Sequence, residues 1–283
     1  MTDRRRGARI LVALSAVGGE RPSLDLYRYL LGDTPPELVG LFVEDLALLA
    51  HARSGLAREI MLSGLERRLE LGGLERQLRA RSAALRRLFE TESARLGVRH
   101  GFEVARGDWD AVLGRAAEQA DALVVEPPGA RGALHVWSRV ELDPLAPLRT
   151  LLLTRGGWRP GGEVAVLIGL DANLAGSPGS ALAAALRLAR RTRSPLTALL
   201  TGAAAGSHGH AAETLEHLAR LRKVELAGCF AVGGEPAPEI VAARARHARL
   251  VVLPGGLDSR FIGELFDRLR GALLLVRSTG TEN

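Results

Sequence analysis

The sequence contains few cysteines, few aromatic residues and almost no lysine. Cys229 is the only cysteine among the 283 residues, which excludes an internal disulfide framework and fits a reducing compartment. It lies in the apolar run 226–232, so we expect a buried thiol on a strand. Lys223 is the only lysine, and arginine therefore supplies nearly all of the basic charge behind a formal net charge of +6.

The scarcity of aromatic residues argues against nucleic-acid binding. Only 4% of the residues are aromatic, and none alternates with arginine as a base-stacking surface requires. The arginines alternate instead with glutamate and leucine, as in 66–70 and 75–79. This mixture is typical of a solvated helix face, so we expect no nucleic-acid partner.

Long apolar runs are also missing, since none reaches the ~18 residues that a membrane helix requires. Arg4–Arg6 followed by the apolar stretch 10–16 resembles a short signal peptide. However, the same apolar pattern recurs at 164–170, where a cleaved signal would have no role. We therefore interpret 10–16 as a first strand and expect a cytoplasmic protein without a membrane partner.

The two halves of the chain match element by element. The apolar stretch 10–16 corresponds to 164–170, and 37–43 corresponds to 195–200. The same spacing separates Gly107 from Gly234 and Gly129 from Gly256. Matching elements in the same order indicate an internal repeat.

Each half predicts the order β-α-β-α-β-α-β-β, with short strands rich in Val, Leu and Ile. Continuous apolar strands that alternate with helices favour a parallel sheet covered on both faces. We therefore expect an α/β fold of two tandem doubly wound parallel five-stranded sheets, in domains 1–157 and 158–283. The boundary falls in the Gly- and Pro-rich stretch 154–162. A single continuous sheet, or halves that fail to superimpose, would count against this interpretation.

The first half is longer than the second, and its extra residues fall within about 46–97. Leucines at helical spacing across 65–88 predict a packed long helix or helical hairpin, which Gly64, Gly72 and Gly73 divide into pieces. A surface that docks a partner is the alternative function for this segment.

The element order resembles the universal stress protein family. A strand that ends in Asp171, a following helix, and a late strand followed by 254–256 and an apolar final strand carry the resemblance. It covers nearly the whole chain, twice. It implies the strand order 3-2-1-4-5 and an intramolecular pairing of the two domains through their final strands, 150–155 and 272–277. A further homodimer is left open.

Members of the family that bind ATP place an Asp at the end of the first strand and carry Gly-x2-Gly-x9-Gly-(Ser/Thr) after the fourth. Glycines allow the backbone to approach phosphates, and a helix N-terminus favours anions. The resemblance therefore implies that ATP or another adenine nucleotide, if bound, is held either by Asp171, Gly255, Gly256 and Gly263 of the second half or by Gly129 and Gly132 of the first.

The phosphate motif is damaged in both halves. The first half has Ser15 in place of the Asp, and Leu142-Asp143 stands where Gly-(Ser/Thr) is required. In the second half the loop from Gly256 to Gly263 is too short, and Glu264 replaces the hydroxyl residue. A carboxylate repels phosphate oxygens, so both loops are interpreted as degenerate.

Other clusters fit structural roles better than catalytic ones. Ser177 lies in a weak nucleophile-elbow pattern, but a helix N-cap is the better interpretation. Asp108 and Glu235 correspond across the repeat and are both expected to cap helices. The group His208, His210, Glu213 and His217 is expected to be solvated, so no catalytic residue and no metal site are predicted.

The sequence therefore predicts a non-enzymatic tandem universal stress protein, a regulatory or binding protein of stress adaptation. The alternative is a switch that binds ATP and hydrolyses it slowly at most. An enzyme of the wider adenine-nucleotide α-hydrolase-like group would need an early pyrophosphate loop, which residues 15–20 do not provide.

Overall fold

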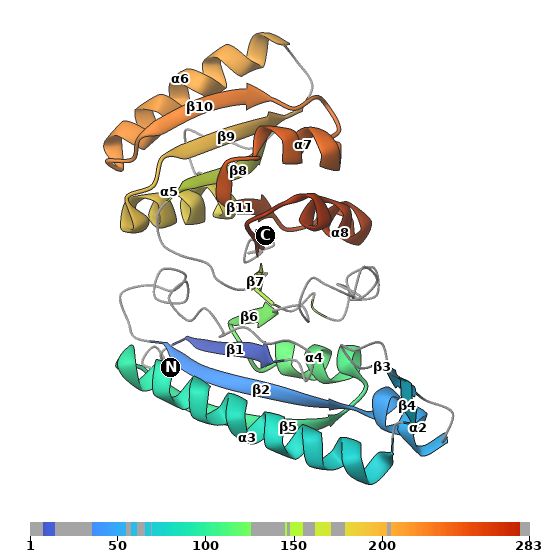
Figure 1. Cartoon of the computed structure of the whole chain (residues 1–283). Helices are drawn as coiled ribbons and strands as arrows, with labels where there is room; N and C mark the ends of the chain where they lie inside the picture. The colour runs from blue at the N-terminus through green and yellow to red at the C-terminus, as the bar shows by residue number, and fades with distance from the viewer. Residues whose placement is uncertain are drawn as a thin grey trace.

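The computed structural model describes residues 8–14, 36–54, 58–60, 66–68, 70–125, 145, 148–154, 162–170, 179–202 and 205–277. These residues form one long, mostly parallel sheet with helices on both faces (Figure 1). The strands of the first half are β1 (Arg9–Leu14), β2 (Glu37–Asp45), β5 (Arg99–Gly107), β6 (Ala122–Val125) and β7 (Thr150–Leu153). Those of the second half are β8 (Glu163–Gly169), β9 (Leu196–Thr201), β10 (Leu226–Ala231), β11 (Ala248–Pro254) and β12 (Ala272–Val276).

The described helices divide between the two halves of the chain. The first half contains α2 (Leu46–Ser54), α3 (Leu71–Arg95) and α4 (Trp109–Ala117). The second contains α5 (Ser180–Thr192), α6 (Ala205–Leu221), α7 (Pro238–Arg244) and α8 (Ser259–Arg268). No described helix combines the length and the apolar character that a bilayer crossing demands.

The strand order confirms the predicted fold class and corrects the number of sheets. The order is β10-β9-β8-β11-β12-β7-β6-β1-β2-β5, a single continuous ten-stranded sheet, which is the result that was expected to count against two separate sheets. Each half of it has the order 3-2-1-4-5 when its own strands are numbered along the chain. All neighbouring strands are parallel except β12 and β7, which pair antiparallel. The sheet is thus two like five-stranded units that meet at their fifth strands.

The junction forms because each fifth strand would otherwise be an exposed apolar edge. Leu273, Leu274 and Leu275 pair with Leu153, Leu152 and Leu151, and all six are buried. Free edges of this kind favour pairing, since their backbone amides and carbonyls need partners. Beyond the strands, the Arg277 amide donates to the Arg149 carbonyl at 2.9 Å, and the Arg277 guanidinium donates to the Leu145 carbonyl. The expected meeting of the final strands is therefore confirmed. The proposed boundary at 157/158 lies outside the described residues.

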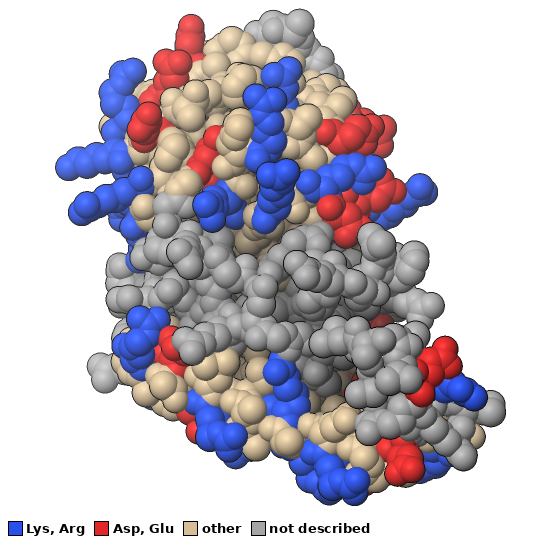
Figure 2. Space-filling view, in the orientation of Figure 1, with Lys and Arg blue, Asp and Glu red and all other residues tan. Residues whose placement is uncertain are grey.

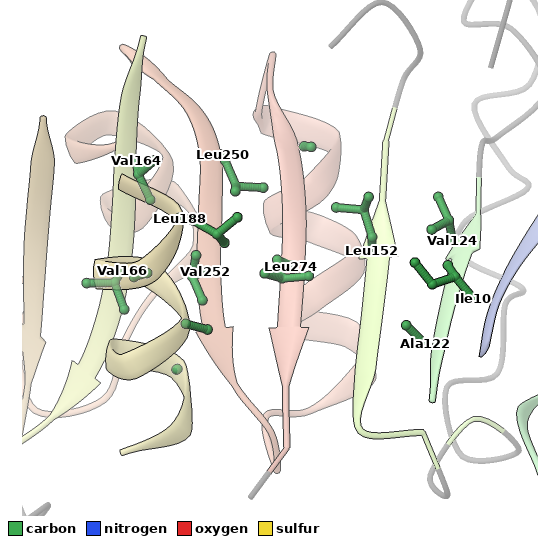
Figure 3. Close-up of a cluster of buried hydrophobic side chains, with 14 of the residues drawn as sticks. Ile10, Ala122, Val124, Leu152, Val164, Val166, Leu188, Leu250, Val252 and Leu274 are labelled. Carbon is green, nitrogen blue, oxygen red and sulfur yellow. The ribbon is translucent and has the colours of Figure 1, made fainter. Parts of the chain in front are cut away.

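Two apolar layers cover the sheet, one on each face. Alternate residues of β1 divide between them: Ile10 and Val12 belong to one cluster, and Leu11 and Ala13 to the other. Helices α3, α5 and α6 contribute to the first cluster, and α4, α7 and α8 to the second. Figure 3 shows the first cluster continuing across the junction from Leu274 to Leu152. Burial on both faces is the reason why inner strands such as β1 and β8 are apolar almost without interruption.

The long segment of the first half is helical, as predicted, but it also contains a small antiparallel sheet. Strands β3 (Arg58–Ile60) and β4 (Glu66–Arg68) pair between α2 and α3. Gly72 and Gly73 lie in the first turn of α3 and do not interrupt it, whereas Gly64 lies outside the described residues. One face of α3 is buried, and it consists of Leu74, Leu78, Ser82, Leu85, Phe89 and Ser93. Figure 1 shows this helix running along β2 and β5.

Candidate functional site

Only part of the expected nucleotide site lies within the described residues. Asp171, Gly129 and Gly132 lie outside them. Gly255 and Gly256 follow β11 directly, at the carboxyl end of the strand, where ligands of open α/β sheets bind. Gly263 lies inside α8, because that helix already begins at Ser259. The expected loop from Gly256 to Gly263 is therefore wrong, and the connection between strand and helix is only four residues long.

Both glycines after β11 are required by the backbone itself. The Gly255 amide donates to the Val276 carbonyl at 2.9 Å, which extends the pairing of β11 with β12. A Cβ atom on Gly255 would come within 3.1 Å of the Arg277 Cα. Gly256 has a φ of +88°, which side-chain-bearing residues rarely adopt. Close packing and a tight turn thus account for both residues, and the Gly255 amide is already engaged.

The N-terminus of α8 is occupied by a carboxylate of the chain. Asp258 is the N-cap residue, and its Oδ1 accepts a hydrogen bond from the Arg260 amide at 3.3 Å. A first-turn amide of a helix is one of the donors that a bound phosphate would use. The Asp258 side chain takes this donor and places a negative charge at the same end of the helix. A phosphate would have to displace that carboxylate or lie next to it.

The sequence suggested that Glu264 lies beside the turn between β11 and α8, but it does not. It lies in the middle of α8, where its Oε1 pairs with the Arg260 Nε at 2.9 Å. The Arg268 guanidinium donates to the Glu264 carbonyl at 2.8 Å and lies 3.9 Å from its carboxylate. Arg260 is 85% exposed, so these are surface pairs along one helix. A phosphate at this turn would therefore be repelled by the Asp258 carboxylate, and not by Glu264 as the sequence had predicted.

The two expected helix caps behave differently. Asp108 caps α4, and its Oδ1 accepts from the Ala111 amide at 3.1 Å, as predicted. Glu235 does not cap α7, whose N-cap residue is Ala237 with no side-chain hydrogen bond. Helix α5 has Gly179 as its N-cap residue, and Ser177, the expected N-cap, lies outside the described residues.

No metal-binding group is formed by the residues that the structure describes. Among them, no three His, Cys, Asp or Glu side chains come together as metal ligands. Cys229 lies on β10 and is half-buried rather than buried. Burial raises the pKa of its thiol, and the nearby Glu216 carboxylate raises it further. A thiol of this kind is a weak nucleophile at neutral pH.

The charge on the surface is mixed. On the face drawn in Figure 2, Asp and Glu lie among the Lys and Arg side chains in both halves of the molecule. A single continuous basic stripe, which nucleic-acid binding would favour, is not present on the described part of that face.

Asp258 is the residue that sequence reasoning missed in this site. An Asp directly before Ser259 and the apolar residues Phe261 and Ile262 is a recognisable helix start. The expectation of a long glycine loop concealed that signal.

Comparison with known proteins gives structural matches only. No protein-family model matches the sequence, and no curated protein matches it. The chain is similar in structure to a universal stress protein from Archaeoglobus fulgidus DSM 4304, with a TM-score of 0.61 and 14% identity over 98% of both chains. An assigned universal stress protein from Pseudomonas aeruginosa UCBPP-PA14 gives a TM-score of 0.54 and 16% identity over 95% of this chain and 93% of that chain.

A third similar structure is the cytoplasmic domain of a prokaryotic cation chloride cotransporter, with a TM-score of 0.53 and 14% identity over 98% of both chains. All three matches extend over nearly the whole chain, so they include both halves of the sheet and not one unit alone. The chain therefore has the fold of the universal stress proteins.

Proposed function

We propose that this chain is a non-enzymatic tandem universal stress protein that acts in stress adaptation by binding a partner or a small ligand. In this proposal its two units arose by duplication, and neither nucleotide loop retains ATP. The fold shared with two universal stress proteins supports the family assignment. The duplicated strand order supports the tandem arrangement.

The proposal that the chain does not retain ATP rests on a single observation, namely that the Asp258 carboxylate occupies the N-terminus of α8. The Asp258 carboxylate accepts from the Arg260 amide, and the Gly255 amide is bonded to Val276. A triphosphate would have to replace both hydrogen bonds and approach a like charge. Removing one such donor from a phosphate site costs about 1.5–3 kcal/mol, or roughly a tenfold to hundredfold loss of affinity.

Titration calorimetry on nucleotide-stripped protein tests this proposal. We expect no saturable heat when Mg-ATP is added up to about 1 mM, the limit of weak binding. Native mass spectrometry of protein purified without added nucleotide should give the mass of the polypeptide alone. One ATP per chain, or a micromolar dissociation constant, would overturn the proposal if Mg-ATP shifts the amide NMR signals at the start of α8 around Ser259, rather than those elsewhere on the chain. It would favour the ATP-binding switch, with Asp171, Gly129, Gly132, Gly255, Gly256 and Gly263 as the residues to mutate next.

We propose that this chain works through contact with another molecule, in the cytoplasm, and that it carries out no reaction of its own.

A further inference from the structure

An open groove of about 410 Å³ lies in the first half, far along the sheet from α8. It is bounded by α3 and by the carboxyl-terminal parts of β2 and β5, which form that edge of the sheet. Its lining residues come from the helix and from both strands: Arg79, Ser82, Ala83, Arg86, Arg87, Glu44 and Val104. The volume falls within the range of small-molecule sites.

The sheet side of the groove offers an exposed apolar surface. Val104 is 46% exposed, although its neighbour in the sheet, Phe42, is fully buried under the same helix. The cover that α3 provides therefore ends between these two residues. A valine left half-exposed beside a cavity can receive the apolar part of a ligand.

The helix side of the groove is positively charged. Arg79 and Arg86 lie two turns apart on α3 and Arg87 directly follows Arg86, and none of the three forms an ion pair with a carboxylate in the described part of the chain. Glu75 and Glu90 lie one turn away on the same helix and form no ion pair with these arginines. The guanidinium of Arg86 lies 5.0 Å from the centre of the Phe102 ring, which holds it in place at the groove.

The acidic residue of the groove is already neutralised. The Glu44 carboxylate accepts from the Arg106 guanidinium at 2.8 and 2.9 Å, and the Glu44 side chain is 13% exposed. Its charge is therefore balanced within the sheet and does not compensate the arginines of α3. The groove retains an excess of positive charge that the folded chain does not satisfy.

The fold does not require these arginines, because the second half lacks them. Helix α6, which packs against β10 as α3 packs against β5, carries one arginine, Arg220, in its last turn. Six arginines lie on α3, in the segment by which the first half exceeds the second. The basic groove is thus a property of the first half alone.

We propose that this groove binds a small amphipathic anion. Its phosphate or carboxylate group is held by Arg79, Arg86 and Arg87, and its apolar part rests on Val104 and Ala83. Guanidinium groups match both oxyanions through paired hydrogen bonds. The site is separate from the turn after β11, so this inference does not depend on the proposed function.

Phenyl phosphate is a suitable probe, and inorganic phosphate, which lacks the apolar ring, is the comparison ligand. In calorimetry at low ionic strength we expect one saturable site per chain for phenyl phosphate and at least ~5-fold weaker binding of inorganic phosphate. Arg86→Gln and Arg79→Gln should each weaken phenyl phosphate binding by about tenfold or more. Arg220→Gln, an exposed arginine on α6, is the matched control and should leave the affinity unchanged.

A second measurement locates the bound probe and does not depend on the variants. In amide NMR spectra, phenyl phosphate should shift Ala83 and Val104 and leave the start of α8 at Ser259 unchanged. The inference is overturned if the native protein does not bind the probe, if Arg220→Gln weakens binding as much as Arg86→Gln, or if the shifts lie outside the groove.

Discussion

Asp108 and Asp258 each begin a helix that follows a strand of the sheet, and each satisfies a first-turn amide of its own helix. At α8 this arrangement determines what the site can hold, since the same amide cannot serve a ligand at the same time. A cap as well as a missing glycine therefore separates this chain from the phosphate-binding pattern that the resemblance implied. The position of a cap depends on where the helix begins, and the glycines of the segment obscured that point.

The capping role of Asp108 can be measured against its repeat counterpart. Asp108→Ala should lower the free energy of unfolding by about 1 kcal/mol, whereas Asp108→Asn should change it little, because Asn caps equally well. Glu235→Ala is the matched control, since Glu235 is exposed and the N-cap residue of α7 is Ala237. Urea denaturation followed by circular dichroism gives the three values. Equal losses for Asp108→Ala and Glu235→Ala would contradict the assignment.

The Cys229 thiol should react slowly at pH 8. Burial, with a further contribution from Glu216, raises its pKa, so the thiolate fraction at any pH below that pKa is smaller than in free cysteine. We expect at least ~10-fold slower reaction with Ellman's reagent than in urea, and a rate that increases as the pH rises. Glu216→Gln should speed the reaction modestly. Equal rates for folded and unfolded protein would show that the thiol is exposed and unperturbed.

At the scale of elements, α3 is the largest departure of one half from the other. It runs along β2 and β5, and its attachment depends on Phe89, which is fully buried and meets the Phe102 ring edge to face at 6.3 Å. Gly40 makes this possible, because a Cβ atom there would lie 2.9 Å from the Phe102 ring and 3.2 Å from the Phe89 ring.

Phe89→Ala should therefore cost about 3–5 kcal/mol of stability, as truncation of buried aromatic residues does. Ile240→Ala, at a 43% exposed position on α7, should cost less than about 1 kcal/mol. Thermal and urea unfolding of the two variants provide the comparison. A loss of under 1 kcal/mol at Phe89 would mean that α3 is only loosely attached to the sheet.

Periodicity predicted the large elements well and the small ones poorly. The uninterrupted apolar strands 10–16 and 164–170 correspond to β1 and β8, and the leucine spacing of α3 corresponds to its buried face. The β3–β4 pair was missed because strands of three residues, with charges at Arg58 and Glu66, have no apolar alternation to detect. The basic groove was also missed, since it depends on which face of α3 the sheet leaves uncovered.

At the scale of the whole molecule, the antiparallel pairing of β12 with β7 joins the two units. Apolar side chains continue across it on both faces, so the halves share their cores as well as their backbone hydrogen bonds. The strand repeat alone could not distinguish two separate sheets from one joined sheet, because edge pairing is a property of assembled units. Damage at the junction should therefore affect both halves.

Leu274→Asp tests this coupling, because Leu274 is 1% exposed and pairs with Leu152. An unpaired carboxylate there should cost at least ~4 kcal/mol. All three tryptophans lie at positions 109, 137 and 158, so fluorescence reports on the first half and the linker, whereas the variant lies in the second half. We expect the fluorescence and circular dichroism midpoints to fall together. Leu221→Asp, at a 64% exposed site, is the control.

Hydrogen–deuterium exchange of the native chain measures the junction most directly. If the two halves form one sheet through β12 and β7, the amides of Leu151–Leu153 and Leu273–Leu275 should exchange as slowly as those of β1 and β8, the middle strands of the two halves. Rapid exchange in both of these segments, while β1 and β8 remain protected, would show that two separate sheets lie side by side without pairing. That result would contradict the single ten-stranded sheet in which β12 pairs with β7.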